Sequence, residues 1–274
     1  MQSIEFYKME GAGNDFVVID NRNNGFTLDE IVTFSPKLCH RRFGVGADGV
    51  LVLEKPQIPD VNYTLIYRNA DGSDAGMCGN GARCMAFFAS KNGFPSSQIF
   101  NVHNVIYSAT ILGDENIEIS FPDVSSPKNI SFDGFALVKV HTGTEHVVEF
   151  TDTAKLEDED ALVKEGRTIR LHPKLNPPGT NVNFVCINNN ENIDLQTYER
   201  GVENLTLACG TGALASAIAT HFKKQSKSTD SKVTINVKGG TLVASFHFDP
   251  AAKTYTNIKL SGPAHIVYKG NIEI

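Results

Sequence analysis

Short runs of alternating apolar and polar residues recur along the first half of the chain and predict strands. In the run 62–68, Tyr63, Leu65 and Tyr67 fall on alternate positions, a period of two that is typical of a half-buried strand. We expect further strands at residues 4–8, 16–20, 50–53, 98–103, 105–112 and 116–121. Apolar residues with helical spacing occupy residues 28–40 and 78–91, so each of these two segments is expected to form a helix.

The second half of the chain repeats this mixture of strands and helices. Strands are expected at residues 135–140, 146–150, 182–187, 194–200, 233–237, 242–248, 255–260 and 265–268. Helices are expected in the acidic segment 154–165 and at 213–224. Between the halves, residues 122–129 carry the proline, aspartate and serine residues that are typical of a turn or linker. The pattern therefore predicts an α/β (mixed α+β) protein with a domain boundary at about residues 122 and 123.

A short motif occurs once in each half of the chain. Cys78-Gly-Asn-Gly-Ala82 opens the predicted helix of the first half, and Cys209-Gly-Thr-Gly-Ala213 precedes that of the second, 131 residues later. Tyr67 and Tyr198 each precede the cysteine by 11 residues, at the end of an alternating strand. The repeat predicts two domains of common ancestry, each presenting a cysteine at the start of a helix.

Composition and charge narrow the class of protein. The chain has 274 residues, 41% hydrophobic content and a net charge of -6, values typical of a globular protein and unlike those of a nucleic-acid-binding one. No segment reaches the roughly 18 consecutive apolar residues of a membrane span, and the first residues do not resemble a signal peptide. We therefore expect a cytoplasmic protein without a nucleic-acid or membrane partner. The odd number of cysteines, five, and their spacing argue against a disulfide framework and against a metal site.

A cysteine at the start of a helix has a distinctive chemistry. The unpaired N–H groups and partial positive charge of a helix N-terminus stabilise a thiolate and attract a carboxylate. Glycines directly after the cysteine let a bound carboxylate approach the backbone closely. Two such thiols facing one substrate suit α-proton exchange with inversion, in which one sulfur removes a proton and the other returns one to the opposite face.

The motifs that carry this chemistry resemble those of the diaminopimelate epimerase family, in order and at similar spacing over nearly the whole chain. They are Lys8-Met-Glu-Gly-Ala-Gly-Asn-Asp-Phe16, Asn69-Ala-Asp-Gly-Ser73, Cys78-Gly-Asn-Gly-Ala-Arg-Cys84, Tyr198-Glu-Arg-Gly-Val202 and Cys209-Gly-Thr-Gly212. The resemblance implies an isomerase that interconverts LL- and meso-diaminopimelate, in lysine and peptidoglycan precursor synthesis, without a cofactor or a metal. It also implies a homodimer.

The implied fold is a pair of pseudo-symmetric domains, each a curved, mostly antiparallel sheet or barrel around a central helix, with the active site in the cleft between them. The predicted domains are residues 1–122 with Cys78 and residues 123–262 with Cys209. The final strand, residues 263–274, is expected to return to the N-terminal domain.

The resemblance also assigns roles to residues of this sequence. Cys78 and Cys209 would be the two catalytic bases, while His146 and Glu199 would tune the pKa of the thiols. The expected substrate-binding residues are Asn14, Asn69, Gly79, Asn80, Asn181, Glu199, Arg200, Gly210 and Thr211.

The sequence departs from the family pattern at two places. The usual Gly-Asn-Pro-His motif reads Gly143-Thr-Glu-His146, so Thr144 replaces an expected substrate-binding asparagine. The segment from Glu199 to Cys209 is one residue longer than is usual. Both departures bear on recognition of the distal end of the substrate, and not on the type of reaction.

Other interpretations remain open at this point. A related racemase or isomerase of the same fold, proline-racemase-like or phenazine-synthesis-like, is the first alternative. A thiol-based redox or binding protein is the second, and it predicts no solvent deuterium in any substrate. The remaining thiols, those of Cys39, Cys84 and Cys186, are expected to be buried and inert.

Overall fold

The chain forms two units in the structure, a computed structural model that describes residues 3–175, 177–189, 191–226 and 228–273. Unit 1 comprises Met1–Ile119 and Gly262–Ile274, and unit 2 comprises Ser120–Ser261. The last strand of the chain pairs with the first one, which brings the C-terminal residues into unit 1.

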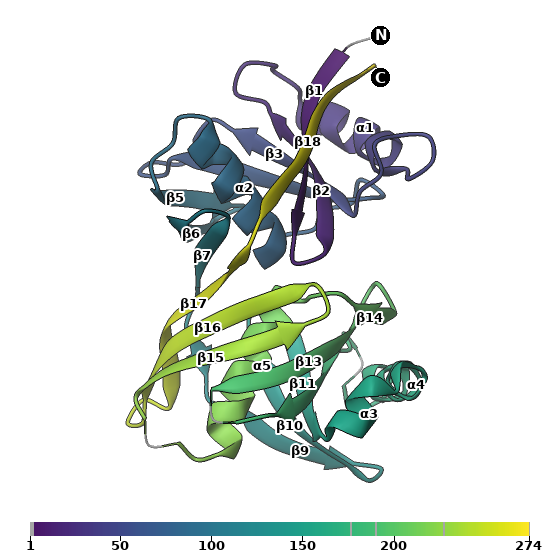
Figure 1. Ribbon diagram of the computed structural model, residues 1–274, viewed down its shortest axis with the longest axis vertical. Helices are drawn as coiled ribbons and strands as arrows, with labels where there is room; N and C mark the ends of the chain where they lie inside the picture. Colours follow the sequence, from purple (N-terminus) through teal and green to yellow (C-terminus); the bar gives the residue numbers. More distant parts are fainter. Residues whose placement is uncertain (1–2, 176, 190, 227, 274) are drawn as a thin grey trace. The chain divides into compact units, whose positions relative to one another are not determined.

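Unit 1 is a mixed sheet with two helices (Figure 1). Its strands are β1 (Ser3–Gly11), β2 (Asn14–Asp20), β3 (Gly49–Glu54), β4 (Tyr63–Asn69), β5 (Ser97–Val102), β6 (Val105–Gly113), β7 (Asn116–Phe121) and β18 (His265–Glu273). Its helices are α1 (Leu28–Cys39) and α2 (Gly79–Lys91). The strands pair in the order β18-β1-β2-β3-β4-β5-β6-β7.

Unit 2 is built from a second sheet and three helices. Its strands are β8 (Val124–Ser125), β9 (Lys128–Phe132), β10 (Phe135–His141), β11 (Glu145–Thr151), β12 (Asn181–Ile187), β13 (Asn192–Glu199), β14 (Asn204–Thr206), β15 (Asp230–Val237), β16 (Gly240–Asp249) and β17 (Thr254–Pro263). Its helices are α3 (Thr153–Glu157), α4 (Glu159–Arg170) and α5 (Gly210–Lys223). The main pairing order is β9-β10-β11-β12-β13-β15-β16-β17-β8, with β14 also on β13.

The two sheets have the same sequence of strand directions. From β1 to β6 the successive pairings are antiparallel, parallel, antiparallel, parallel and antiparallel, and the same series runs from β10 through β13 and β15 to β16. A helix follows β2 and β11, and a second helix follows β4 and the β13–β14 hairpin. The common origin expected from the cysteine motif is therefore reflected in the topology.

In each unit the helix that follows a cysteine is enclosed by the sheet. Helix α2 contacts β1, β2, β3, β4, β6 and β18, and α5 contacts β10, β11, β12, β13, β15 and β16. Residues 79–89 of α2 are all buried, as are nearly all of residues 210–221 of α5. Small residues such as Gly81 and Gly212 near each helix start make this enclosure possible, because a Cβ at either would press on a strand side chain.

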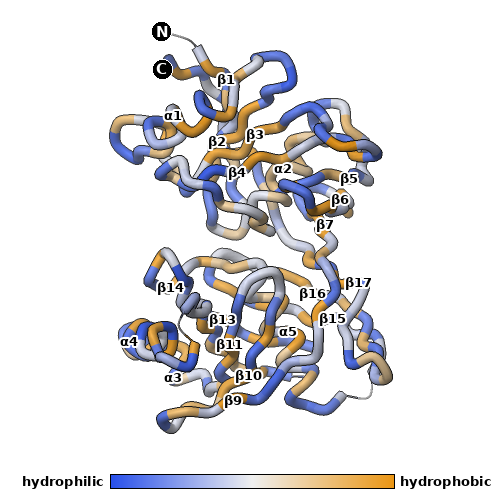
Figure 2. Tube along the Cα trace, turned by 180° about the vertical axis from the view of Figure 1, so that it is seen from behind, coloured by the Kyte–Doolittle hydropathy of each residue, from blue (hydrophilic) through white to orange (hydrophobic). Residues whose placement is uncertain are grey.

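The opposite face of each sheet is covered by the remaining helices. In unit 1, Ile31, Phe34 and Leu38 of α1 pack on valine and isoleucine side chains of β2 and β3. In unit 2, Leu162 and Ile169 of α4 pack on β11, β12 and β13. Figure 2 shows the hydrophobic residues that run along β2 and β3, whose two covered faces explain the nearly continuous apolar sequences at residues 16–19 and 50–53.

Several details differ from the sequence-based expectations. The predicted acidic helix is two helices, because Asp158 ends α3 and its side chain accepts a hydrogen bond from the N–H of Ala161 in α4. The predicted linker 122–129 contains β8 and the start of β9. Pro36 lies inside α1 without ending it, and β18 is longer than the predicted short strand.

The pairing of Tyr67 with Tyr198 in the repeat was wrong by one residue. Tyr198 packs with the α4 cluster, whereas Tyr67 contacts Phe16 and the backbone at Gly49 on the α2 side of its sheet. The strand register instead makes Tyr67 equivalent to Thr197. The extra residue between β13 and α5 explains why counting back from the cysteines gave the wrong match.

Candidate functional site

Cys78 and Cys209 occupy the same position in the two units. Each is the N-cap residue of its buried helix, with φ and ψ of -120° and 119° at Cys78 and of -119° and 111° at Cys209. Neither helix has an acidic residue in its first turn, so no carboxylate of the helix itself competes for its N–H groups. The glycines predicted to bind a carboxylate, Gly79 and Gly210, are the first residues of α2 and α5.

In unit 1 the predicted site residues Asn80 and Asn14 belong to a chain of side-chain hydrogen bonds in which every donor and acceptor is determined. The buried Arg83 donates to Oδ1 of Asn80 at 2.7 Å, and Nδ2 of Asn80 donates to Oδ1 of Asn14 at 2.5 Å. Nδ2 of Asn14 then donates to Asp48 at 3.1 Å. A guanidinium at one end and a carboxylate at the other fix the orientation of both amides, so that Asn80 and Asn14 are held beside Cys78.

Charged side chains fasten the hairpin that carries Asn14. Lys8 donates to Asp15 at 2.6 Å and to the carbonyl of Gly46, while Arg41 bridges Asp15 and Asp48. Burial disfavours the charged form of Asp15, but the hydrogen bonds from Arg41 and Lys8 hold the pKa of Asp15 below its usual range. The carboxylate therefore stays ionised and keeps the loop in place.

Asn69 lies at the end of β4, and its backbone neighbour across the sheet is Gly49 of β3. Its Nδ2 donates to the hydroxyl of Ser73 at 3.0 Å, within the turn that leads toward Cys78. The structure thus places Asn69 at the same sheet edge as the β2–β3 end where Asn14 and Asp48 meet.

In unit 2 the thiol of Cys209 contacts the hydroxyl of Thr211, which in turn contacts the ring of His146. Oγ1 of Thr211 lies 3.6 Å from Sγ of Cys209, and Nε2 of His146 lies 3.0 Å from the same Oγ1. His146 is completely buried, and this burial, together with the positive charges of His141 and Arg200, lowers its pKa to about 3. His146 is therefore a neutral hydrogen-bonding group at physiological pH.

Three of the predicted substrate-binding residues, Asn181, Glu199 and Arg200, also lie close together in unit 2. Oδ1 of Asn181 accepts the backbone N–H of Arg200 at 2.8 Å, and Nδ2 of Asn181 donates to the carbonyl of Glu145 at 3.4 Å. The guanidinium of Arg200 donates to Oγ1 of Thr144 at 3.3 Å. Thr144 thus contacts the predicted substrate-binding arginine, and Glu199 precedes that arginine at the end of β13.

The predicted site residues therefore form two sets, one in each unit. Sequence reasoning missed residues that support them, above all Arg83, Asp48, Asn183 and Thr197. Arg83 stood within the quoted cysteine motif, and its place three residues, about one helical turn, after Asn80 was the available signal. Asn183 and Thr197 lie on strands and Asp48 directly precedes β3, and at these positions the sequence pattern does not distinguish a buried polar residue from a surface one.

The remaining cysteines are buried free thiols. Burial raises the pKa of Cys39 to about 12 and raises that of Cys84 further still. Their burial is as expected, and the raised pKa favours the protonated form of both thiols at neutral pH. Among the described residues, no group of three or more His, Cys, Asp or Glu side chains is arranged to hold a metal ion.

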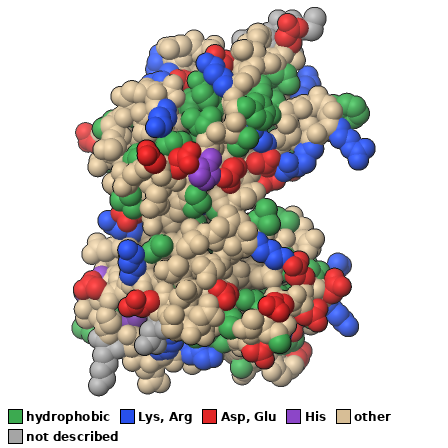
Figure 3. Space-filling view, in the orientation of Figure 1, with side chains coloured by type: hydrophobic (Ala, Val, Ile, Leu, Met, Phe, Trp, Pro, Cys, Tyr) green, Lys and Arg blue, Asp and Glu red, His purple; other side chains and the backbone are tan. Residues whose placement is uncertain are grey.

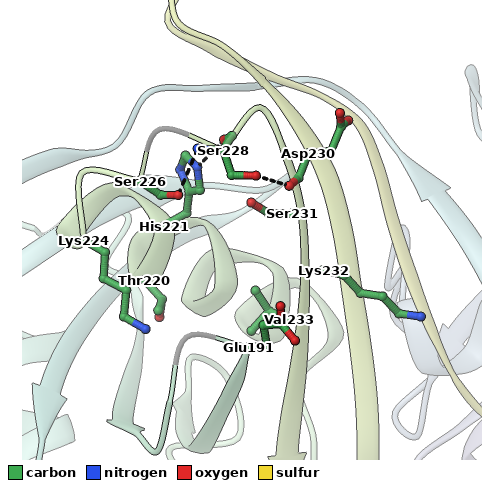
Figure 4. A pocket seen from close by; sticks show the side chains of 10 residues that line it. All are labelled: Glu191, Thr220, His221, Lys224, Ser226, Ser228, Asp230, Ser231, Lys232 and Val233. Carbon is green, nitrogen blue, oxygen red and sulfur yellow. Dashed lines mark hydrogen bonds between the residues drawn. The ribbon is translucent and has the colours of Figure 1, made fainter.

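A pocket of about 380 Å³ opens in unit 2 near the C-terminal end of α5 (Figure 4). Its histidine, His221, is occupied on both ring nitrogens, by the hydroxyl of Tyr255 and the carbonyl of Ser228. Thr220 and His221 are 11 and 12 residues along the chain from Cys209, which corresponds to about 16–18 Å along a helix. This pocket is therefore separate from the cysteine site.

On the face drawn in Figure 3, lysine and arginine side chains are scattered among aspartate and glutamate side chains. None of the helices in the described part of the chain has the length and apolar character needed to cross a membrane.

Solved structures with a similar fold define the class of protein. A phenazine biosynthesis protein of the PhzF family from Bacillus anthracis superposes with a TM-score of 0.78 over 100% of both chains, at 13% identity. A hydroxyproline epimerase from Agrobacterium vitis, with bound trans-4-hydroxy-L-proline, gives a TM-score of 0.71 over 98% of this chain and 92% of its own, at 11% identity. The fold is therefore that of the PhzF-like and proline-racemase-like α/β proteins.

Within this class, the sequence comparisons identify the family. The family model for diaminopimelate epimerase matches residues 6–105 and 138–264. Diaminopimelate epimerase from Flavobacterium psychrophilum is 39% identical over 270 residues, covering 98% of this chain and 100% of the relative. That from Aquifex aeolicus is 36% identical over 285 residues, covering 98% of each. The chain belongs to the diaminopimelate epimerase family.

Proposed function

We propose that this protein interconverts LL- and meso-diaminopimelate by a two-base reaction that uses Cys78 and Cys209. The observation that carries the proposal is the matched geometry of the two cysteines, each the N-cap of a buried, acid-free helix start in a chain of this family. Two equivalent acid/base groups suit a reaction that removes a proton from one face of a carbon and adds one to the other face.

The chemistry requires stabilisation of a carbanion equivalent. An amino-acid α-proton is much less acidic than a thiol, so the negative charge that develops on the adjacent carboxylate must be met by hydrogen-bond donors. Gly79 and Asn80 begin α2, and Gly210 and Thr211 begin α5, so their backbone N–H groups lie at helix N-termini, where donors can meet a bound carboxylate. An oxyanion donor of this kind contributes about 2.7–4 kcal/mol when water is excluded, so several of them lower the barrier substantially.

The other polar residues would hold the rest of the substrate. Arg200 supplies a cation for the distal carboxylate, and the amides of Asn14, Asn69 and Asn181 supply neutral donors and acceptors for ammonium and carboxylate groups. Thr144 positions Arg200 through its hydroxyl. This assignment is supported by the hydrogen bond from the backbone of Arg200 to Asn181, which ties two of these residues together.

The decisive test is isotope exchange. Purified protein is incubated with LL-diaminopimelate in deuterated water, with a chelator and without added cofactor, and the product is analysed by mass spectrometry and chiral chromatography. We expect meso-diaminopimelate carrying one α-deuterium, and no deuterium in trans-4-hydroxy-L-proline treated in parallel. Deuterium in hydroxyproline alone would assign the protein to the other activity of this fold class. Absence of deuterium from both compounds would sink the proposal.

Substitution of the two thiols tests the roles of the bases. Cys78→Ala and Cys209→Ala are each expected to abolish conversion to meso-diaminopimelate, because one face of the α-carbon then lacks its acid or base. Cys186→Ala is the control, since Cys186 is a buried thiol outside the two helix starts. Near-normal turnover in either of the first two variants would remove that cysteine from the mechanism.

Three expectations from the sequence remain predictions: a cytoplasmic location, a homodimer, and independence of any cofactor. Light scattering of the purified protein measures the oligomeric state, and a mass near that of one 29.8 kDa chain would contradict the dimer. Activity that survives dialysis against chelator supports the absence of a metal requirement.

A further inference from the structure

The two units differ in the chemistry that surrounds the start of their buried helices. In unit 1 the side chains of Phe16 and Leu51 pack against Gly81 of α2. The strand register makes His146 the equivalent of Phe16 and Asn183 the equivalent of Leu51. An apolar contact in unit 1 is therefore replaced in unit 2 by two buried polar side chains, which require hydrogen-bond partners and thereby a defined orientation.

The neighbours of Asn183 determine which terminal atom of its amide is the nitrogen and which is the oxygen. One of its terminal atoms lies 3.0 Å from the carbonyl oxygen of Val147, which can only accept, so this atom is the nitrogen Nδ2. The other terminal atom, Oδ1, accepts from the hydroxyl of Thr197 at 3.0 Å. Nδ2 also lies 3.1 Å from Nδ1 of His146, and its second hydrogen points to that nitrogen. Asn183 therefore donates to His146.

This contact determines where His146 carries its proton. A ring nitrogen that accepts a hydrogen bond is unprotonated, and His146 is neutral because it is fully buried. The proton of the neutral ring is then on Nε2, which lies 3.0 Å from Oγ1 of Thr211. The other charged groups that act on the ring, His141 at the end of β10 and Arg200 after β13, also favour its neutral form.

The direction of hydrogen-bond donation extends from His146 through Thr211 to Cys209. Because Oγ1 of Thr211 accepts from Nε2–H of His146, its own hydrogen is available as a donor, and Sγ of Cys209 lies 3.6 Å away. We propose that Asn183 is a positioning residue, which fixes the Nε2–H tautomer of His146 and so directs the hydroxyl of Thr211 to donate to the thiolate of Cys209. The opposite tautomer would accept the hydroxyl hydrogen itself and leave the sulfur without it.

The backbone is adapted to this arrangement at Gly212. A Cβ at residue 212 would lie 2.5 Å from Oδ1 of Asn183 and 3.2 Å from Oγ1 of Thr197. Glycine therefore lets the amide sit directly against the first turn of α5. In unit 1 the same contact is made by a methyl group of Leu51, 3.0 Å from a Cβ built at Gly81. The contact that is polar at Gly212 in unit 2 is therefore apolar at the equivalent Gly81 in unit 1.

A matched buried asparagine elsewhere separates positioning from simple structural support. Oδ1 of Asn101 accepts from the hydroxyl of Thr64 at 2.7 Å, and its Nδ2 donates to the carbonyl of His103 at 2.8 Å. Asn101 is 2% exposed and Asn183 is 0% exposed, so the two amides have the same kinds of backbone and threonine partners in similar burial. Only Asn183 also contacts a histidine ring, which makes Asn101→Asp the control for Asn183→Asp.

The first test reads the tautomer directly by ¹⁵N NMR of protein labelled at histidine, with the signals of His146 assigned from a His146→Gln sample. In the wild type we expect an unprotonated Nδ1 and a protonated Nε2 throughout pH 6–8. In Asn183→Asp we expect Nδ1 to become protonated, because a carboxylate accepts and cannot donate. Asn101→Asp should leave the His146 signals unchanged. A protonated Nδ1 in the wild type overturns the proposal.

The second test follows the thiol. The rate of iodoacetamide modification of Cys209 is measured against pH in a Cys78→Ala background, with peptide mass spectrometry to identify the modified residue. Thr211→Val removes the hydroxyl at nearly constant shape and should raise the pH midpoint by about one to two units, the effect of a lost hydrogen bond to a charged group. Thr211→Ser should restore it. An unchanged midpoint in Thr211→Val overturns the proposal.

Asn183→Asp is expected to change the shape of the alkylation profile. The ionisations of His146 and Cys209 then become coupled, so the profile should require two steps in place of one. Asn101→Asp should retain a single step even if it lowers the stability of the protein. A single unshifted step in Asn183→Asp would contradict the proposal.

The inference rests on the proposed role of Cys209 as a base. Neither test uses diaminopimelate, however, so loss of the positioning by Asn183 and failure of the proposed activity give different results.

Discussion

Gly81 and Gly212 hold equivalent positions in the two units, but replacement with alanine should destabilise the protein at Gly212 and have little effect at Gly81. In Gly212→Ala the new Cβ would meet Oδ1 of Asn183 at 2.5 Å, a distance that real Cβ atoms do not tolerate. In Gly81→Ala the nearest atom is a methyl carbon of Leu51 at 3.0 Å, which can move by a few tenths of an ångström. The prediction compares the two variants, so that each is the control of the other.

The expected magnitude follows from the hydrogen bonds of Asn183. To avoid the new Cβ the amide must shift, and it then weakens its contacts to Thr197, Val147 and His146, each now 3.0–3.1 Å long. One or two buried groups left unsatisfied cost about 1–3 kcal/mol each. Alanine returns up to about 1 kcal/mol as the better helix former. Gly212→Ala should therefore lower the free energy of unfolding by about 2–4 kcal/mol.

Gly81→Ala has only the favourable part of this balance and a small steric adjustment. Its free energy of unfolding should stay within about 1 kcal/mol of the wild type. At about 2–4 °C per kcal/mol for domains of this size, the melting temperature of Gly212→Ala should fall by about 4–16 °C and that of Gly81→Ala by no more than about 4 °C.

Urea unfolding followed by circular dichroism gives the free energies, and hydrogen exchange with mass spectrometry locates the loss. We expect faster exchange in β12 and the first turns of α5 of Gly212→Ala, and unchanged exchange in unit 1. Equal stability of the two variants, or a greater loss in Gly81→Ala, would refute the reasoning from these contacts.

Three further predictions concern reactivity, pH dependence and binding. In the native protein at pH 8, iodoacetamide should modify Cys78, which is half-buried, and leave Cys39 and Cys84 unmodified, because burial raises the pKa of these two thiols. Peptide mass spectrometry identifies the modified residues, and early modification of Cys39 or Cys84 would contradict the prediction. Burial raises the pKa of Glu149 to about 7, so the stabilising contribution of its protonated form is present below its unfolded value and is lost as the pH rises through about 7. Between pH 5 and pH 8, the free energy of unfolding of the wild type should therefore fall by about 1–2 kcal/mol relative to that of Glu149→Gln, after allowance for solvent screening. Urea unfolding measures both free energies, and a difference between them that does not change with pH would show that the carboxyl titrates normally. Thr144→Val removes the hydroxyl that accepts a hydrogen bond from Arg200, and it should raise KM for diaminopimelate up to about tenfold with little change in kcat. An unchanged KM would show that this hydroxyl has no role in substrate binding.

Much of the local structure could be predicted because it depends on neighbouring residues. The alternating residues of β4 and the helical spacing of α2 gave these elements to within a residue or two. The break at Asp158 was missed although its cause is also local, because an acidic segment without interruption looks like one solvated helix. The short strands β8, β9 and β14 were missed because two to five residues are too few to show an alternating pattern, and the partner of β8, β17, also lies far away along the sequence.

The cysteine motifs could be found from the sequence because glycines directly after a thiol leave the backbone N–H groups at the start of a helix accessible to a ligand. Core packing does not require a cysteine followed by glycines, so this pattern indicates a site. The supporting residues could not be found in this way. Arg83 is fully buried yet is a charged residue of the kind that usually faces water, and only the neighbouring Asn80 and the carbonyl of Pro263, 180 residues away, explain its position. Asn183 looks in the sequence like one more residue of a strand.

The sequence by itself determined that this protein presents two equivalent thiols, each at the start of a helix, because a short motif of cysteine and glycine specifies its own backbone conformation. It also determined the family, since the motifs keep their order and spacing. Only the tertiary structure decided that the two thiols have different surroundings. Phe16 and Leu51 in one unit and His146 and Asn183 in the other come together through strand register, and the direction of a hydrogen bond depends on atoms that the chain brings into contact from distant positions.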